Sequence, residues 1–281
     1  MVGSVDKLKG KKVVVVGGTS GIGHGAALAL LEHGAHVTII SSSEQRVKSV
    51  VEDVGDDKLH GRVANVREEE DFIEVLRSLA PIDHLVFSGV DKVCKRRVPF
   101  GFVSSGMHSA VGYPGLTLSR SSEAQLPKPT LTNAGTSSAS NSGEARSVVR
   151  RPRNMDIINP GGSLTLTSGT GAMNPGKTAS IGGALNAGLF TMTQGLALEL
   201  ADKRIRVNCV VPGIVATELW DKMGTIGSGD EQNQKLKAMG EKLPVGFCAT
   251  GEDIAEAYLY AIRANYATGT LITIDGGGVL K

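Results

Sequence analysis

The sequence predicts a single α/β domain over residues 1–281, in which a doubly wound parallel sheet of about seven strands is covered by helices on both faces. Two observations lead to this prediction. Short β-branched runs recur along the chain, and helical patterns of about 10 to 15 residues separate them. This alternation is typical of parallel sheets, because the chain must cross back to the same edge before each new strand.

Seven runs have the length and composition of buried strands. They are residues 13–16, 36–40, 59–63, 82–87, 163–167, 205–211 and 271–274. Helices are expected from about residue 26 to Gly34 and over 44–54, 67–79, 180–200 and 251–263. Residues 217–240 are polar, and we expect a mobile flap there.

Composition limits the functional classes. Hydrophobic residues make up 41% of the chain and charged residues 21%, which is enough to bury a core without disulfides. The net charge of +2 gives no reason to expect nucleic acid or an anionic membrane as a partner. No apolar run approaches the roughly 18 residues of a membrane span, and residues 1–12 lack the apolar stretch of a secretory signal. The three cysteines show no metal-ligand spacing, so we expect no metal site, and their odd number argues against a disulfide framework. With no signal or membrane span either, we expect a cytoplasmic protein.

A glycine-rich turn follows the first predicted strand and precedes a helical pattern. It reads Gly17-Gly18-Thr19-Ser20-Gly21-Ile22-Gly23. Glycines let the backbone approach a pyrophosphate, and a helix N-terminus offers unpaired N–H groups to the same anion. We therefore predict a Rossmann-like dinucleotide site formed by Gly17, Thr19, Ser20, Gly21, Ile22 and Gly23. The alternative is an ordinary strand-to-helix turn.

Further motifs stand near the ends of later predicted strands. They are Asn65-Val66, Ser88-Gly89-Val90, Arg206-Val207-Asn208, Pro212-Gly213-Ile214 with Thr217, and Asp275-Gly276-Gly277. Together with the glycine turn, over residues 10–90 and 157–280, they resemble the motifs of the short-chain dehydrogenase/reductase family. Val16 replaces the threonine that begins the family's glycine motif.

The resemblance implies a role for each motif. Asn65 and Val66 would meet the adenine, and Ser88, Gly89 and Val90 would line the cofactor. The segment from Arg206 through Pro212, Gly213, Ile214 and Thr217 would form the nicotinamide-carboxamide site. The resemblance also implies a small-molecule substrate and a homo-oligomer.

Residues after the second predicted strand bear on the choice of cofactor. NAD-preferring sites usually carry a carboxylate about 20 residues after the glycine turn, where it binds the ribose 2′-hydroxyl. Here Ser41, Ser42, Ser43 and Arg46 occupy that stretch, and a guanidinium pairs well with phosphate oxygens. We therefore predict NADP, bound as NADPH, in preference to NAD. The alternative is NAD. It is favoured by the nearby Glu44, and it would apply if the Arg46 side chain is simply solvated and binds no phosphate.

The catalytic set that the resemblance implies is incomplete. Ser168 stands after the fifth predicted strand, where the family has its catalytic serine. The positions of the family's Tyr-x-x-x-Lys pair fall on Gly182 and Asn186, and neither side chain can transfer the proton or carry the charge. Candidate proton donors are Ser168, Lys177, Thr178 and Ser180. Alternatively, Ser168 only caps the end of the strand, and the other three are ordinary polar residues of the surface.

The order Ser168, then Pro175-Gly176-Lys177, then Gly182-Gly183-Ala184 resembles a divergent branch of the family that lacks the Tyr-Lys pair. Members of that branch in fungal secondary metabolism bind NADPH and act on imines or in cyclisations. We therefore predict an NADP-dependent oxidoreductase that reduces a C=O or C=N bond of a small molecule, in secondary metabolism. The alternative is a redox-neutral or catalytically inactive NADP-binding protein of the same fold.

Residues 91–155 interrupt the pattern. This segment holds ten Lys and Arg against three acids, with eleven serines and five prolines, in a chain whose remainder is net acidic. Such a composition favours irregular or poorly ordered chain over packed structure. The family has a long helix between its fourth and fifth strands, and this segment shows no helical stripe of that length. We therefore hypothesise that it is translated intron or frame-shifted sequence; a genuine insertion is the alternative.

Overall fold

The computed structural model describes residues 5–89, 156–177, 179–224 and 226–281, and seven strands of this part form one parallel sheet. Their order across the sheet is β3-β2-β1-β4-β5-β6-β7. The strands are β1 (Lys12–Val16), β2 (His36–Ser41), β3 (Leu59–Val63), β4 (Ile82–Phe87), β5 (Ile158–Thr167), β6 (Arg206–Pro212) and β7 (Leu271–Ile274). Every neighbouring pair is parallel, which confirms the predicted doubly wound sheet.

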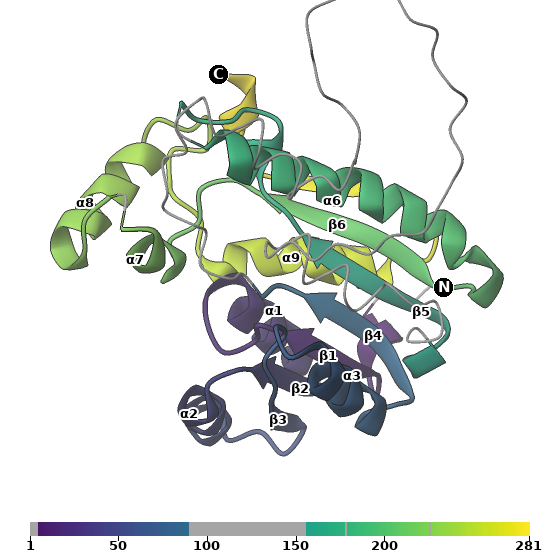
Figure 1. Ribbon diagram of the computed structural model, residues 1–281. Helices are drawn as coiled ribbons and strands as arrows, with labels where there is room; N and C mark the ends of the chain where they lie inside the picture. Colours follow the sequence, from purple (N-terminus) through teal and green to yellow (C-terminus); the bar gives the residue numbers. More distant parts are fainter. Residues whose placement is uncertain (1–4, 90–155, 178, 225) are drawn as a thin grey trace, which may run out of the picture. The chain divides into compact units, whose positions relative to one another are not determined.

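Helices cover both faces of this sheet, as Figure 1 shows for α6 on one face and for α1 and α9 on the other. The helices are α1 (Gly21–Glu32), α2 (Glu44–Val54), α3 (Glu69–Ser78), α6 (Ser180–Glu199), α7 (Leu219–Met223), α8 (Gly229–Gly240) and α9 (Gly251–Arg263). Short 3₁₀ turns are η1 (Val5–Leu8), η4 (Thr170–Ala172), η5 (Ala201–Lys203) and η6 (Gly278–Leu280). All five predicted helices are present.

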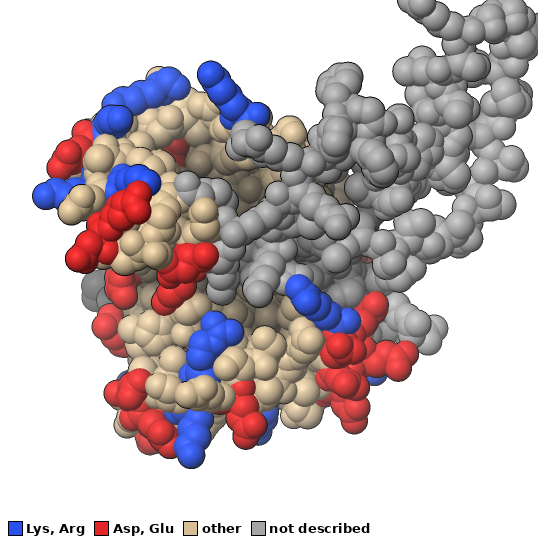
Figure 2. Space-filling view, turned by 60° about the vertical axis from the view of Figure 1, so that its left-hand side comes forward, with Lys and Arg blue, Asp and Glu red and all other residues tan. Residues whose placement is uncertain are grey.

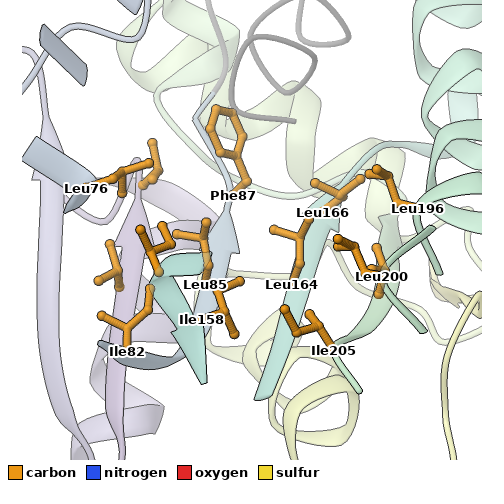
Figure 3. Packing of buried hydrophobic residues seen from close by; sticks show 14 of the residues in the cluster. Leu76, Ile82, Leu85, Phe87, Ile158, Leu164, Leu166, Leu196, Leu200 and Ile205 are labelled. Atoms are coloured by element: carbon orange, nitrogen blue, oxygen red, sulfur yellow. The ribbon is translucent and has the colours of Figure 1, made fainter. Parts of the chain in front are cut away.

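The core consists of two layers, because successive side chains of a strand point to opposite faces. Val14 and Val16 of β1 pack in the layer under α3 and α6, whereas Val13 and Val15 pack in the layer under α1 and α9. Figure 3 shows the first layer, in which Leu164 and Leu166 of β5 lie between Leu85 of β4 and Leu196 of α6. Burial on both faces explains why the strands read as continuous apolar runs.

The start of one strand, β5, differs clearly from the expected one. β5 begins at Ile158 rather than at residue 163, and its register against β4 shifts between Ile82 and His84. Pro160 and Gly161 of β5 are exposed, and Gly161 has φ +85°, so the first part of the strand does not read as a buried β-branched run in the sequence.

The predicted flap over residues 217–240 contains two helices, α7 and α8, which were not predicted from the sequence. Gln232, Leu236 and Gly240 are buried at spacings of four, but two of these three residues are not large and apolar, so the stripe is weak in the sequence. Whether the segment moves stays a prediction. The segment 91–155, expected to be irregular, lies outside the described residues. Among the helices that are described, none is long and apolar enough to cross a membrane.

Candidate cofactor and active site

The residues predicted for the cofactor come together at one edge of the sheet. All seven strands are parallel, so their carboxyl ends meet at the same edge, and the described residues of every predicted motif except Arg206-Val207-Asn208 lie at one of these ends. The crevice outside the carboxyl ends of such a sheet is where open α/β domains bind ligands. On the described part of the face in Figure 2, positive and negative side chains are interspersed, mostly near the periphery.

The glycine turn after β1 is held tightly by its neighbours. Gly17 has φ +83°, and a Cβ there would lie 2.7 Å from the Cα of Gly89, the second residue after β4. A Cβ at Gly23 would lie 2.4 Å from the carbonyl oxygen of Gly17 and 3.1 Å from Ser88 Oγ. The turn and the residues after β4 therefore touch along their backbones, and side chains at Gly17 or Gly23 would force them apart.

The N-terminus of α1 is open to an anion. The cap residue Ser20 makes no side-chain cap hydrogen bond, and the first turn of α1 contains no acidic residue. By contrast, α9 is closed by a Thr250–Asp253 capping box, and α3 carries three acids in its first turn. The N–H groups at the start of α1 fit the pyrophosphate of a dinucleotide, and Glu218 is the acid beside them, with Oε2 3.5 Å from the position of a Cβ at Gly21.

The end of β2 presents hydroxyls and a guanidinium. Ser41 is the last residue of β2, and Ser43 caps α2, where its Oγ accepts a hydrogen bond from the Arg46 backbone N–H at 3.4 Å. Ser42 and the Arg46 side chain are exposed. After β3, Asn65 Oδ1 accepts from the backbone N–H of Arg67 at 3.1 Å. Val66, next to it, packs against the core.

The end of β6 also faces the glycine turn. Thr217 Cγ2 would lie 3.0 Å from a Cβ at Gly21, and a Cβ at Gly213 would lie 2.8 Å from Asp275. Pro212 ends β6, and Ile214 is partly buried beyond it. The next helix, α7, carries Trp220, the single tryptophan of the sequence, whose indole N–H donates to Val215 O at 2.8 Å. Thr217 is thus placed between α7 and the start of α1.

Arg206 and Asn208 lie elsewhere. Both side chains are buried and reach the C-terminal end of α9 and the loop after it. The guanidinium of Arg206 donates to the carbonyls of Ala261 at 2.7 Å and Ile262 at 2.6 Å, and Asn208 Nδ2 donates to Ala267 O at 2.9 Å. Both side chains donate to carbonyls at and beyond the end of α9 that the helix itself leaves unpaired. Within the segment from Arg206 to Thr217, only the part from Pro212 onward therefore lies at the carboxyl edge of the sheet.

Ser168, the predicted catalytic serine, directly follows β5. Its backbone N–H donates to Val210 O at 2.9 Å, and its hydroxyl donates to the carbonyl of Asn186 in α6 at 2.9 Å. Asn186 Nδ2 would lie 3.2 Å from a Cβ at Gly169. Ser168 is therefore in contact with the turn of α6 in which the sequence places Asn186.

The other proton-donor candidates are placed less favourably. Lys177 and Ser180 are exposed, and α6 contains neither tyrosine nor lysine. Thr178 and the predicted cofactor residue Val90 lie outside the described residues. Within the part of the chain that is described, no three His, Cys, Asp or Glu side chains could hold a metal ion.

One residue beside the site was not predicted from the sequence. Tyr258 of α9 is fully buried, and its hydroxyl lies 2.5 Å from Thr167 Oγ1, at the end of β5. Burial raises the pKa of Tyr258, although hydrogen bonds with Thr167 and Ser88 oppose the shift. The signal in the sequence that could have indicated this residue is a tyrosine, with its polar hydroxyl, on a face of the predicted helix that is otherwise apolar.

Comparisons with known proteins agree with this geometry. Residues 11–90 match a family model described as short chain dehydrogenase, and residues 148–281 match one described as SDR-like Rossmann domain. A 3-oxoacyl-(acyl-carrier-protein) reductase, FabG of Chlamydia pneumoniae, is 30% identical over 96% of this chain and 97% of its own length. The chain belongs to the short-chain dehydrogenase/reductase family.

Fungal members of the short-chain dehydrogenase/reductase family are also similar. The enzyme fsr5 of Gibberella fujikuroi is 29% identical over 99% of this chain and 97% of its own length. A solved structure titled MalC Reductase/Diels-Alderase, from Malbranchea aurantiaca, has a TM-score of 0.71 at 25% identity, covering 99% of this chain and 100% of the other. The protein is thus an oxidoreductase of a small molecule, and its Rossmann fold binds a nicotinamide cofactor.

Proposed function

We propose that the protein is an NADP-dependent reductase of a C=O or C=N bond, and that C=N is the better substrate. The observation that carries the cofactor assignment is the end of β2, where Ser41, Ser42 and Ser43 precede the exposed Arg46. Three hydroxyls and a guanidinium suit a 2′-phosphate, whereas a carboxylate at this place would repel it. Glu44 is the one acid within residues 41–46.

The residues of this chain would bind different parts of the cofactor and the substrate. Gly17, Gly21 and Gly23 admit the pyrophosphate, and Asn65 and Val66 flank the adenine. The ends of β4 and β6 flank the nicotinamide through Ser88, Gly89, Pro212, Gly213, Ile214 and Thr217. When bound, NADPH supplies a hydride. We assign the Ser168 hydroxyl to the substrate heteroatom: it would turn from the Asn186 carbonyl to donate to a C=O oxygen, or keep that bond and accept from the N–H of a protonated C=N.

The preference for C=N follows from the composition of α6. With Gly182 and Asn186 at the positions of the family's Tyr and Lys, the helix provides no acid to protonate an alkoxide. An imine is basic enough to take its proton from water before reduction, so it needs no strong acid from the enzyme. The solved relative titled a reductase/Diels-Alderase supports the reductase part of this proposal.

The same observation about α6 favours a second candidate. A protein without the Tyr-Lys pair could keep the cofactor site and serve as a redox-neutral enzyme or a binding protein. In that case the cofactor would bind and remain unoxidised, whatever the substrate. A cytoplasmic location and a homo-oligomer stay predictions under either candidate.

Incubation with NADPH and a panel of ketones and cyclic imines, followed by nicotinamide absorbance, separates the two. We expect oxidation of NADPH with cyclic imines and slower or no oxidation with ketones. Ser168→Ala should reduce the rate by about tenfold or more, as expected for the loss of one hydrogen bond to a charged substrate. The control is Ser49→Ala, an exposed residue of α2 outside the site. Tight NADPH binding without oxidation by any substrate would support the second candidate and reject the first.

A further inference from the structure

The hydroxyl of Tyr258 lies at the ends of two neighbouring strands. Its bond to Thr167 Oγ1 is 2.5 Å long, and the Ser88 side chain is close enough to lower the pKa of the hydroxyl. Thr167 is the last residue of β5 and Ser88 is the first residue after β4, one step beyond the registered pair Phe87 and Leu166. A side chain from α9 is therefore bonded to the end of β5 and lies beside the end of β4, where the ladder between the two strands stops.

Both strand ends lead directly into the candidate site. The backbone N–H of Ser88 donates to Val16 O at 2.9 Å, and Ser88 Oγ lies 3.1 Å from the position of a Cβ at Gly23. Thr167 immediately precedes Ser168, whose hydroxyl is held from the other face of the sheet by the carbonyl of Asn186. The Tyr258 hydroxyl thus connects the residue beside the glycine turn with the residue beside the candidate catalytic serine.

We propose that Tyr258 is a positioning residue, which fixes the spacing of the Ser88 and Thr167 strand ends so that the cofactor site and Ser168 stay aligned. This inference rests on the proposed function for its consequence, but the alignment itself is a property of the chain alone. The ligand class concerned is a nicotinamide dinucleotide bound over the carboxyl edge of the sheet.

Packing alone does not account for this residue. The side chain is 0% exposed, so a phenylalanine would bury the same ring without a hydroxyl that needs a partner. Burial also raises the pKa of the hydroxyl, which keeps it neutral and able to donate one hydrogen bond while accepting another. These properties suit a hydrogen bond that holds the end of β5 in a fixed place beside Ser88, and they do not suit a proton donor to substrate.

The test compares Tyr258→Phe with Tyr260→Phe, a control on the exposed face of the same helix, where Tyr260 is 51% exposed. Hydrogen exchange without cofactor is measured in peptides covering residues 85–89 and 164–171. We expect exchange there to become several-fold faster in Tyr258→Phe and to be unchanged in Tyr260→Phe. Unchanged exchange in Tyr258→Phe would overturn the proposal.

A second readout concerns the cofactor. Energy transfer from Trp220 to bound NADPH gives the dissociation constant, which should rise roughly fivefold in Tyr258→Phe, as expected for one lost hydrogen bond. Thr167→Val should give the same loss, and the double variant should lose no more than either single one. A lower melting temperature with unchanged affinity and unchanged local exchange would indicate a merely structural role and reject the proposal.

The two proposals fail in different ways. If the wild-type protein does not bind NADPH, the proposed function is rejected, and the exchange comparison still decides whether Tyr258 fixes the strand ends. If the wild type binds NADPH and Tyr258→Phe binds it equally well with full protection, the proposed function stands and the role of Tyr258 is rejected.

Discussion

Replacement of Gly23 by alanine should damage cofactor binding more than any other single methyl group added to α1. A Cβ at Gly23 would lie 2.4 Å from the carbonyl oxygen of Gly17 and 3.1 Å from Ser88 Oγ. The nearest atom belongs to the backbone, so no side-chain rotation can relieve the clash. The glycine turn must move away from the N-terminus of α1, which is the place where we expect the pyrophosphate.

The magnitude follows from the cost of overpacking. Forcing a methyl group into a well-packed site costs about 1–3 kcal/mol, and each 1.4 kcal/mol corresponds to a factor of ten in affinity. We therefore expect Gly23→Ala to weaken NADPH binding by about tenfold or more in calorimetry. Urea unfolding should show a loss of about 1–3 kcal/mol in the free energy of unfolding.

Two variants serve as controls. Gly25→Ala places a Cβ 2.3 Å from the backbone of Gly251, so it should lower stability through the contact of α1 with α9 while weakening NADPH binding less. At Gly188 in α6 a Cβ meets no atom within 4 Å, and Gly188→Ala should stabilise the helix by about 0.5–1 kcal/mol. If Gly23→Ala folds and binds NADPH as tightly as the wild type, the assignment of this turn to the pyrophosphate is wrong.

Three further predictions concern other parts of the chain. Burial and the positive charge of Arg206 lower the pKa of His84 from 6.5 to about 4, so the unfolded chain binds more protons between these values. The free energy of unfolding should therefore fall by about 3 kcal/mol from pH 6.5 to pH 4, and a profile equally steep in His84→Gln would contradict this. Gly182→Tyr with Asn186→Lys should raise ketone reduction on the order of 100-fold, since a Cβ at Gly182 meets no atom within 4 Å; no gain in a folded variant would count against the placement of the pair. Sequencing of the spliced transcript should show that it does not encode residues 91–155 in frame with both flanks; a transcript that does so would refute the hypothesis of translated intron or frame-shifted sequence.

Much of the fold could be predicted because its signals are local. The four valines of residues 13–16 and the glycines that follow them specify a strand, a turn and a helix within about 20 residues of chain. Several alternating strand and helix units predict a parallel sheet. The motifs that follow the strands are then expected at its carboxyl edge, where such sheets bind ligands. The placement of Ser168 after β5 follows from the same reasoning.

What could not be predicted depends on contacts between distant residues. The bond between Thr167 and Tyr258 joins residues 91 positions apart in the sequence, on a strand and a helix, and no local pattern announces it. The capping of α9 by Arg206 has the same character, because the carbonyls it binds belong to residues more than 50 positions away. The helix α8 was missed for another reason: its buried positions include Gln232 and Gly240, which carry little hydrophobic signal.

The most direct test of the account is the affinity of the protein for NADPH and NADH, measured by calorimetry on the wild type and on Arg46→Asp. The account predicts at least about tenfold tighter binding of NADPH, because a guanidinium paired with phosphate contributes more than 1.4 kcal/mol. Arg46→Asp should remove most of that preference, while Lys48→Asp, an exposed change of equal charge on the same helix, should leave most of it in place. Equal affinities for the two cofactors, before and after the substitution of Arg46, would contradict the central claim.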